Sequence, residues 1–417
     1  MRPRWNRIRA SLPAIVGVAF LLRVAWILIG HTYRFKTANH NFSFGWEMGS
    51  IGAAIASGHG FSDPFGVPTG PTAWEPPLYP YVVAAVFSIF GIYSKLSAFV
   101  LLTVNSGFSA LTCIPIFRIG RRVFSEKVAV GSAWAWALLP NVMFWCTRDV
   151  WETSLSALLL ALMVWQALTL EDLEGLRPWG EFGLLWGIAG LSSTSLLSFL
   201  PACGIWVWYR RQKIGRRSLA GVVLGSAVFF ACIAPWLIRN QRTFGRFIFI
   251  RDNFGAELRL GNGPGADGTW MEYLHPTQDI YAMRQYESLG ELSYVEMRKR
   301  EAVEFIRSDY GRFAKLCLKR FVYFWAGPPR ATQSAWMNGI KNSLFLTSSL
   351  LCFWGLALAL GGRRPGAWLL FWLILIYPAI YYAVFTMPRY RHPIEPAMAI
   401  LCVFAVTKAA RASSARD

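Results

Sequence analysis

Charged residues are scarce in this 417-residue chain: they make up 16% of the sequence, whereas soluble domains carry about 25%. Hydrophobic residues make up 54%, and the mean hydropathy is +0.36. This composition excludes an ordinary soluble protein and predicts a polytopic membrane protein. Acidic residues are especially few, with 23 Asp and Glu against 42 Lys and Arg. Because the basic residues lie mostly in short loops between apolar runs, membrane topology explains the net charge of +19 better than nucleic-acid binding.

The sequence also lacks the motifs of several common chemistries. Its seven cysteines lie mainly inside apolar segments without paired spacing, so they indicate neither redox chemistry nor structural zinc. There is no P-loop and no Rossmann glycine pattern after a strand, so no nucleotide site is expected. No internal repeat and no low-complexity tract is visible.

Long apolar runs are abundant, and a run of about 20 residues predicts one membrane-spanning helix. We expect about ten spans, at residues 12–29, 97–117, 128–146, 153–170, 181–194, 195–208, 219–238, 340–360, 365–385 and 393–408. The pair within 181–208 is short and interrupted by serines and Pro201, which predicts a tight hairpin or a single bent unit. Residues 79–94 are apolar but short and follow two prolines, which favours a helix along the outer interface. The expected fold class is an all-α polytopic bundle.

The basic residues predict the orientation of these spans. With a cytoplasmic N-terminus, the inner loops 118–127, 209–218 and 361–364 and the tail with Lys408 and Arg416 are basic, as the positive-inside rule requires. Loop 171–180 is the acidic exception. The first run follows four arginines within residues 2–9 and lacks a cleavage site, so we expect a retained anchor.

This topology places three segments outside: loop 31–96, the turn 146–152 and segment 239–338. We therefore expect an N-terminal membrane module (1–238), a small extracytoplasmic domain (239–338) and C-terminal membrane helices with a cytoplasmic tail (339–417). Candidate chemistry must come from polar groups in the three outer segments.

Two carboxylates stand in loop 31–96, which is rich in Gly, Pro and aromatic residues, as binding loops are. Glu47 follows Trp46 and precedes an apolar helical stretch, whose packing would bury the acid and raise its pKa toward that of a general base. Glu75 lies between Trp74 and two prolines, which present the carboxylate on a rigid backbone. The alternatives are a solvated Glu47 and an incidental Glu75 at a proline-stiffened helix start.

A third acid, Glu152, follows the outer turn and stands four residues after Arg148, so the two could simply pair on a helix. The stretch Arg389-Tyr390-Arg391 lies at the outer end of the last span, against the positive-inside trend. Guanidinium groups bind phosphate oxygens bidentately, which makes these arginines candidates for a lipid phosphate. Alternatively, they reach phospholipid headgroups from within the bilayer.

These features, in this order, resemble the GT-C class of membrane glycosyltransferases, in particular the bacterial branch similar to dolichyl-phosphate-mannose protein mannosyltransferases and aminoarabinose transferases. The shared features are an acid after the first span, Pro-Pro-Leu-Tyr-Pro before the interface helix, Arg-x-x-x-Glu at the head of the fourth span, Pro-Trp-x-x-Arg-Asn with a later Gly-Asn-Gly, and Arg-Tyr-Arg-x-Pro before the last span. The resemblance implies a GT-C-like bundle, a polyprenyl-phosphate-linked sugar donor, transfer on the outer face and inversion at the anomeric carbon.

The resemblance also implies roles for single residues. It makes Glu47 the base that deprotonates the acceptor, and it places Glu75 and Glu152 near the donor sugar and Arg389 and Arg391 on the donor phosphate. We further expect Arg239 and Arg148 to bind this phosphate. Five other residues are expected to contact the substrate: Trp46, Trp74, Tyr79, Asn240 and Tyr390. The chain departs from the family where many members have Asp or Asp-Glu in place of Glu47, and where the aminoarabinose branch has Lys in place of Pro76.

The expected function is inverting transfer of a sugar from a polyprenyl-phosphate donor to a hydroxyl of an envelope lipid, glycan or protein. The enzyme is expected in the bacterial plasma membrane with its site on the extracytoplasmic face. No obligatory cofactor is predicted, and a divalent metal stays open because no His/Asp/Glu spacing is diagnostic. A lipid or solute transporter and a non-catalytic partner in envelope glycan assembly remain alternatives, although Arg23 is the only clear mid-span charge.

Overall fold

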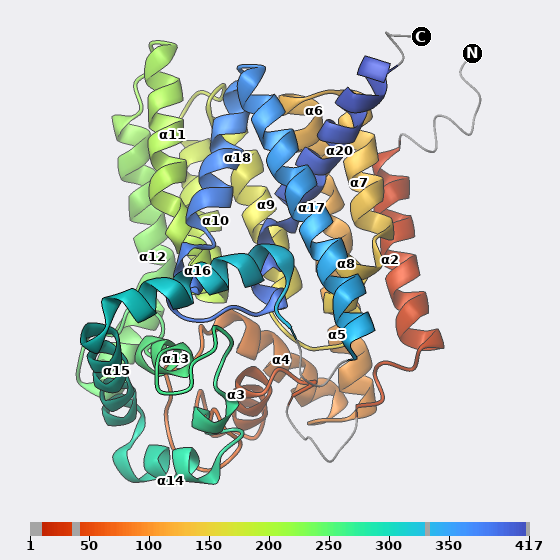
Figure 1. Cartoon of the computed structure of the whole chain (residues 1–417). Helices are drawn as coiled ribbons and strands as arrows, with labels where there is room; N and C mark the ends of the chain where they lie inside the picture. The colour runs from red at the N-terminus through yellow and green to blue at the C-terminus, as the bar shows by residue number, and fades with distance from the viewer. Residues whose placement is uncertain (1–10, 36–41, 330–333, 414–417) are drawn as a thin grey trace.

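The computed structural model describes residues 11–35, 42–329 and 334–413, and within these ranges every regular element is a helix. The arginines before residue 11 and Arg416 lie outside the described residues. A tall bundle stands on a smaller layer of helices (Figure 1). The bundle contains α2 (Leu12–Ile29), α5 (Lys95–Leu111), α6 (Cys113–Val123), α7 (Glu126–Leu138), α8 (Pro140–Thr147), α9 (Thr153–Leu170), α10 (Arg177–Ser192), α11 (Leu200–Lys213), α12 (Leu219–Phe244), α17 (Ala335–Gly361), α18 (Pro365–Ile376), α19 (Ala379–Ala383) and α20 (Glu395–Ser413), with the 3-10 helices η2 (Thr194–Phe199) and η4 (Pro388–Ile394). The layer contains α3 (Glu47–Ala56), α4 (Leu78–Phe90), α13 (Phe254–Gly261), η3 (Glu272–Leu274), α14 (Ile280–Leu289), α15 (Glu291–Ser308) and α16 (Tyr310–Ala326).

The apolar runs form the bundle, which confirms the all-α polytopic fold class. Seven of the described helical stretches are long and apolar enough to cross a membrane, or eight if the bent pair α7 and α8 is one span. The difference from ten lies in residues 181–208, which form two helices of 16 and 14 residues joined by η2. Pro201 begins α11, where its missing N–H costs nothing, and does not bend a longer helix. The apolar stretch after the two prolines forms the short helix α4.

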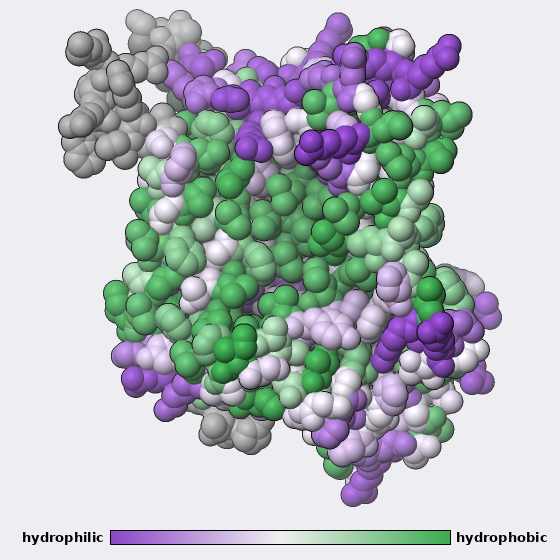
Figure 2. All heavy atoms as spheres, turned by 180° about the vertical axis from the view of Figure 1, so that it is seen from behind, coloured by the Kyte–Doolittle hydropathy of each residue, from purple (hydrophilic) through white to green (hydrophobic). Residues whose placement is uncertain are grey.

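The two ends of the bundle differ in character. A green apolar belt separates two hydrophilic ends (Figure 2). Helix α2 begins and α20 ends at the end that carries the basic loops, whereas the small layer lies at the opposite end (Figure 1). The acidic loop after α9 fits this basic end because its carboxylates pair with arginines: Glu171 with Arg210, Asp172 with Arg122 and Glu174 with Arg216.

Arg23, the mid-span charge, stabilises a break in a neighbouring span. Pro140 lacks an N–H, and α7 and α8 meet there at an angle of 51°. Carbonyls that this break frees accept hydrogen bonds from Arg23: Nη2 lies 3.0 Å from Trp136 O, and Nη1 lies 3.0 Å from Ala137 O. Arg23 Nε also donates to Ser109 Oγ at 3.1 Å. The buried guanidinium is therefore fully engaged in holding α2 against the broken span.

The small layer is built from two segments that are far apart in the sequence. Phe65 and Trp74, in the loop between α3 and α4, share one apolar cluster with Met283, Tyr286 and Tyr294 from α14 and α15. Helix α12 runs without interruption to Phe244, past the predicted end of the N-terminal module. The boundaries of the three predicted domains stay predictions.

Candidate active site

Glu47 is the first residue of α3 and is 5% exposed. Its Oε1 lies 3.1 Å from Nε2 of His275, which reaches it from the segment before α14. Nδ1 of His275 accepts the backbone N–H of Thr277 at 3.2 Å, so Nε2 carries the ring proton and donates it toward Glu47. His275 is not predicted from the sequence, because a lone histidine between loop residues carries no pattern.

The backbone before Glu47 is forced against the turn that carries Glu152. Gly45 has a φ of +81°, and a Cβ there would lie 2.2 Å from the carbonyl oxygen of Val150. Val150 N donates to Ser43 O at 2.8 Å. Trp46 follows with a φ of +38°, a left-handed conformation that a bulky side chain rarely adopts and that tends to mark functional sites. Only glycine at position 45 permits this approach of the two outer turns.

The loop that carries Glu75 is fastened from two sides. Glu291, the first residue of α15, accepts the Ala73 N–H through Oε1 at 2.6 Å, and its Oε2 accepts the hydroxyl groups of Thr72 and Tyr286. From α12, Arg239 Nη1 donates to Thr72 O at 2.7 Å and Nη2 donates to Phe61 O at 2.9 Å. The loop is therefore held by the buried Glu291 on one side and the half-buried Arg239 on the other.

Glu75 itself faces other charged groups. Its Oε2 lies 3.4 Å from Nη1 of Arg251, and the side chain is 8% exposed. The pKa of Glu75 is raised to about 8, mainly by burial; Arg251 opposes this shift, and the charges of Glu47, Glu152 and Glu257 contribute to it. Glu75 is therefore mostly protonated at neutral pH and can donate a hydrogen bond.

Glu152 lies at the N-cap of α9 and, within the described part of the chain, its Oε2 has no hydrogen-bond partner. Burial raises the pKa of this carboxyl, and the charge of Arg389 works against that shift. Among the described residues, Glu152 does not form the alternative ion pair with Arg148. Arg148 is exposed, with its guanidinium 5.4 Å from the centroid of the Phe144 ring.

The two arginines of the last span have different surroundings. Arg389 lies with its guanidinium carbon 3.8 Å from the centroid of the Trp151 ring. Arg391 is 3% exposed, and its donors are used by Glu395, by Phe345 O and by Ser349 Oγ. The structure therefore places Arg389 at the candidate site and Arg391 in an interior cluster that ties η4 to α17. Between them, Tyr390 stacks on Tyr381 with ring centroids 4.5 Å apart.

Three other predicted site residues hold elements of the site in place through hydrogen bonds or packing. Asn240 Nδ2 donates to Ile250 O at 3.1 Å, which fixes the turn before Arg251. Tyr79 is fully buried and donates to Asn105 Oδ1 at 2.9 Å; Asn105 Nδ2 in turn donates to Trp151 O at 3.3 Å. Trp74 is 1% exposed and belongs to the apolar cluster of the layer. Their positions indicate support for the site rather than contact with a substrate.

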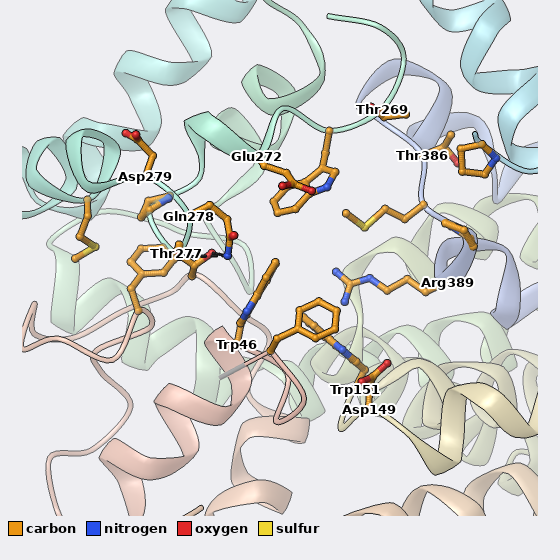
Figure 3. Close-up of a pocket in the computed structure, with 18 of the residues that line it drawn as sticks. Trp46, Asp149, Trp151, Thr269, Glu272, Thr277, Gln278, Asp279, Thr386 and Arg389 are labelled. Carbon is orange, nitrogen blue, oxygen red and sulfur yellow. Dashed lines mark hydrogen bonds between the residues drawn. The ribbon is translucent and has the colours of Figure 1, made fainter. Parts of the chain in front are cut away.

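A cavity of about 1140 Å³ opens beside these carboxylates. Trp46, Asp149, Trp151 and Arg389 line its inner part, whereas Glu47, Glu75 and Glu152 do not line it. In Figure 3, Arg389 points toward the centre of the cavity, with Trp151 and Asp149 close by and Trp46 beside them. Burial raises the pKa of Asp149 to about 6. Glu47 and Glu152 thus directly follow Trp46 and Trp151, two residues of the cavity wall, whereas Glu75 has no chain neighbour in the wall.

The described side chains at the site do not form a cluster of metal ligands. Within the described ranges there is no group of three or more His, Cys, Asp and Glu side chains that could hold an ion. Glu47 is paired with His275, and Glu75 with Arg251. The residues present do not fit a divalent cation, and we assign no step to one.

Comparisons with known proteins agree with this architecture. Residues 74–238 match the family model of dolichyl-phosphate-mannose-protein mannosyltransferases. The structure resembles the oligosaccharyltransferase of Archaeoglobus fulgidus in complex with zinc and sulfate (TM-score 0.55, 16% identity), with 94% of this chain and 48% of that chain covered. The oligosaccharyltransferase AglB of Archaeoglobus fulgidus, in complex with an inhibitory peptide and a dolichol-phosphate, gives a TM-score of 0.55 at 14% identity, with 95% of this chain and 50% of that chain covered.

A further similarity is to ArnT from Cupriavidus metallidurans bound to undecaprenyl phosphate, with a TM-score of 0.41, 12% identity and 94% and 78% of the two chains covered. A search of curated proteins found no match. The chain spans about half the length of the archaeal oligosaccharyltransferases that it resembles. The family resemblance is confirmed: residues 74–238 match the mannosyltransferase family, and the chain has a GT-C-like membrane fold.

Proposed function

We propose that this protein is an inverting glycosyltransferase that moves a sugar from a polyprenyl-phosphate donor to an acceptor hydroxyl. The observation that carries the proposal is the convergence of Glu47 and Glu75, from loop 31–96, with Glu152, from the turn before α9, beside Arg389 and a large cavity. The structural similarity adds support, because the archaeal oligosaccharyltransferase AglB was determined in complex with a dolichol-phosphate.

In this proposal the donor phosphate binds at Arg389, whose guanidinium Trp151 keeps in place. Glu47 takes the proton of the acceptor hydroxyl as its oxygen attacks the anomeric carbon. The bond from that carbon to the phosphate oxygen breaks, and its electron pair leaves with the phosphate, which Arg389 stabilises. His275 fixes the orientation of Glu47, and protonated Glu75 donates a hydrogen bond to a sugar oxygen.

The same proposal places the enzyme in the bacterial plasma membrane with its site on the extracytoplasmic face. Support comes from the basic loops, which gather at the end of the bundle opposite the layer (Figure 1). A transporter is less well supported, because Arg23, its candidate mid-span charge, is engaged by carbonyl groups.

Native mass spectrometry of the gently solubilised protein tests this function. We expect a co-purified polyprenyl phosphate, with or without a sugar attached, or its uptake when polyprenyl-phosphate sugars are added. Binding of bulk phospholipid alone, even after this addition, would contradict the proposal and favour a transporter or a non-catalytic partner.

A further inference from the structure

The cavity beside the carboxylates is larger than one sugar ring needs. Its volume of about 1140 Å³ exceeds the range of roughly 300 to 1,000 Å³ that is usual for small-molecule sites. Its walls come from the start of α3, the turn before α9, the segment between α13 and α14, and the turn before η4. A cavity of this size has room for an acceptor beside the donor sugar.

Four tryptophans line this cavity: Trp46, Trp145, Trp151 and Trp270. Trp145 and Trp270 are only half-buried, and Trp46 and Trp270 stand 5.6 Å apart at an angle of 42°. Aromatic rings are flat, rigid apolar surfaces, and the C–H face of a pyranose ring packs well on such a surface. An aromatic-lined cavity therefore suits a saccharide.

The polar groups of the cavity lie at two ends. Arg389 and Trp151 stand on one side, and Thr277, Gln278 and Asp279 on the other (Figure 3). Among the described lining residues, four are acidic (Asp149, Asp267, Glu272 and Asp279), and Arg389 is the one that is basic. Carboxylates and amides accept hydrogen bonds from sugar hydroxyl groups, and the acids that lie away from Arg389, such as Asp279, disfavour an anionic acceptor (Figure 3).

We propose that this cavity is an acceptor site for a neutral or amino-sugar saccharide, with its aromatic and acidic groups positioning a sugar hydroxyl toward Glu47. The inference rests on the proposed transferase function and assigns its acceptor class. A peptide acceptor is less well matched, because the part of the chain described here offers no strand edge for main-chain pairing.

The test is binding of soluble tetrasaccharides to the full-length protein in nanodiscs, measured by saturation-transfer NMR. The panel contains neutral hexose, N-acetylhexosamine, amino-sugar and uronic-acid tetrasaccharides, together with a serine-rich and threonine-rich peptide. We expect neutral or amino-sugar members to bind, and Trp270→Ala to weaken that binding by roughly fivefold to tenfold. Glu272→Gln, at an exposed position, should also weaken binding, whereas Trp270→Phe should retain most of it.

Tyr281→Ala is the matched control, because Tyr281 is 72% exposed and does not line the cavity. Binding of the peptide or the uronic-acid member alone, or of none of the panel at millimolar concentration, would overturn the inference. Equal saccharide binding by wild type, Trp270→Ala and Glu272→Gln would overturn it too. Donor binding, measured on the same samples by native mass spectrometry, separates this failure from failure of the transferase function itself.

Discussion

Glu47 is held by a histidine that comes from a different part of the chain. His275 contacts Glu47 through Nε2 and Thr277 through Nδ1, so its tautomer and its orientation are both set. Neither His275 nor Arg251, the partner of Glu75, was predicted. Both stand in segments without periodic pattern, and only the folded layer brings them to the carboxylates.

The raised pKa of Glu75 predicts a pH-dependent stability. The folded state holds a proton on this side chain up to about pH 8, whereas the unfolded state releases it near the ordinary glutamate pKa of 4.5. The contribution of protonated Glu75 to the free energy of unfolding is fully present below pH 4.5 and is lost as the pH rises through 8. The free energy of unfolding falls by at most about 1.4 kcal/mol per pH unit over this range.

Thermal unfolding in detergent between pH 5 and pH 8.5 measures this effect. The melting temperature of wild type should fall more steeply with pH than that of Glu75→Gln, which cannot ionise. Glu287→Gln, at an exposed position on α14, should follow wild type. Parallel curves for wild type and Glu75→Gln would contradict the raised pKa.

Mutations of the two arginines predicted to bind the donor phosphate should have different effects. Arg389→Gln should weaken binding of a polyprenyl phosphate in native mass spectra with little loss of thermal stability. Arg391→Gln should instead destabilise the fold by about 3 to 5 kcal/mol, because Glu395 loses a buried partner. The reverse ranking would show that Arg391 is the phosphate ligand.

At the scale of helices, the break at Pro140 depends on Arg23. Arg23→Leu should destabilise the protein because two carbonyl groups lose their donors, at about 1 to 3 kcal/mol for each buried unpaired group. Pro140→Ala restores an N–H that can serve the Trp136 carbonyl. We therefore expect Pro140→Ala to be less harmful in the Arg23→Leu background than in wild type, measured by a double-mutant cycle of thermal unfolding. Strictly additive effects would contradict the coupling.

Hydropathy predicted most helices of this fold, because a span requires only length and apolar character. Helices α2 and α9 coincide with the predicted runs 12–29 and 153–170. The structure of residues 181–208 was harder to predict, because two short helices and one bent span have the same hydropathy. The support of the loop before α4 by Glu291 and Arg239 could not be predicted, because hydrogen bonds to loop carbonyls and N–H groups leave no trace in sequence spacing.

At the scale of the whole molecule, the proposal requires the layer and the basic loops to face opposite sides of the membrane. Cysteines placed at Tyr281, in α14, and at Lys213, at the end of α11, test this requirement because both positions are exposed. An impermeant thiol reagent should label Tyr281→Cys in intact cells and Lys213→Cys only after lysis. The parent protein controls for its native cysteines, and the opposite pattern would invert the topology.

The predicted topology placed loop 31–96, with Glu47 and Glu75, and the turn 146–152, with Glu152, on the same side of the membrane, so their proximity could be expected from the sequence. Their roles are the central claim, and sugar transfer by Glu47→Gln tests it most directly. Proteoliposomes with wild type, Glu47→Gln or the exposed control Glu287→Gln would receive the polyprenyl-phosphate sugar identified by mass spectrometry, and single-turnover transfer would be followed. We predict that Glu47→Gln binds the donor normally and transfers at least about a hundredfold more slowly, while the control matches wild type. Unchanged transfer by a well-folded Glu47→Gln protein would contradict the account.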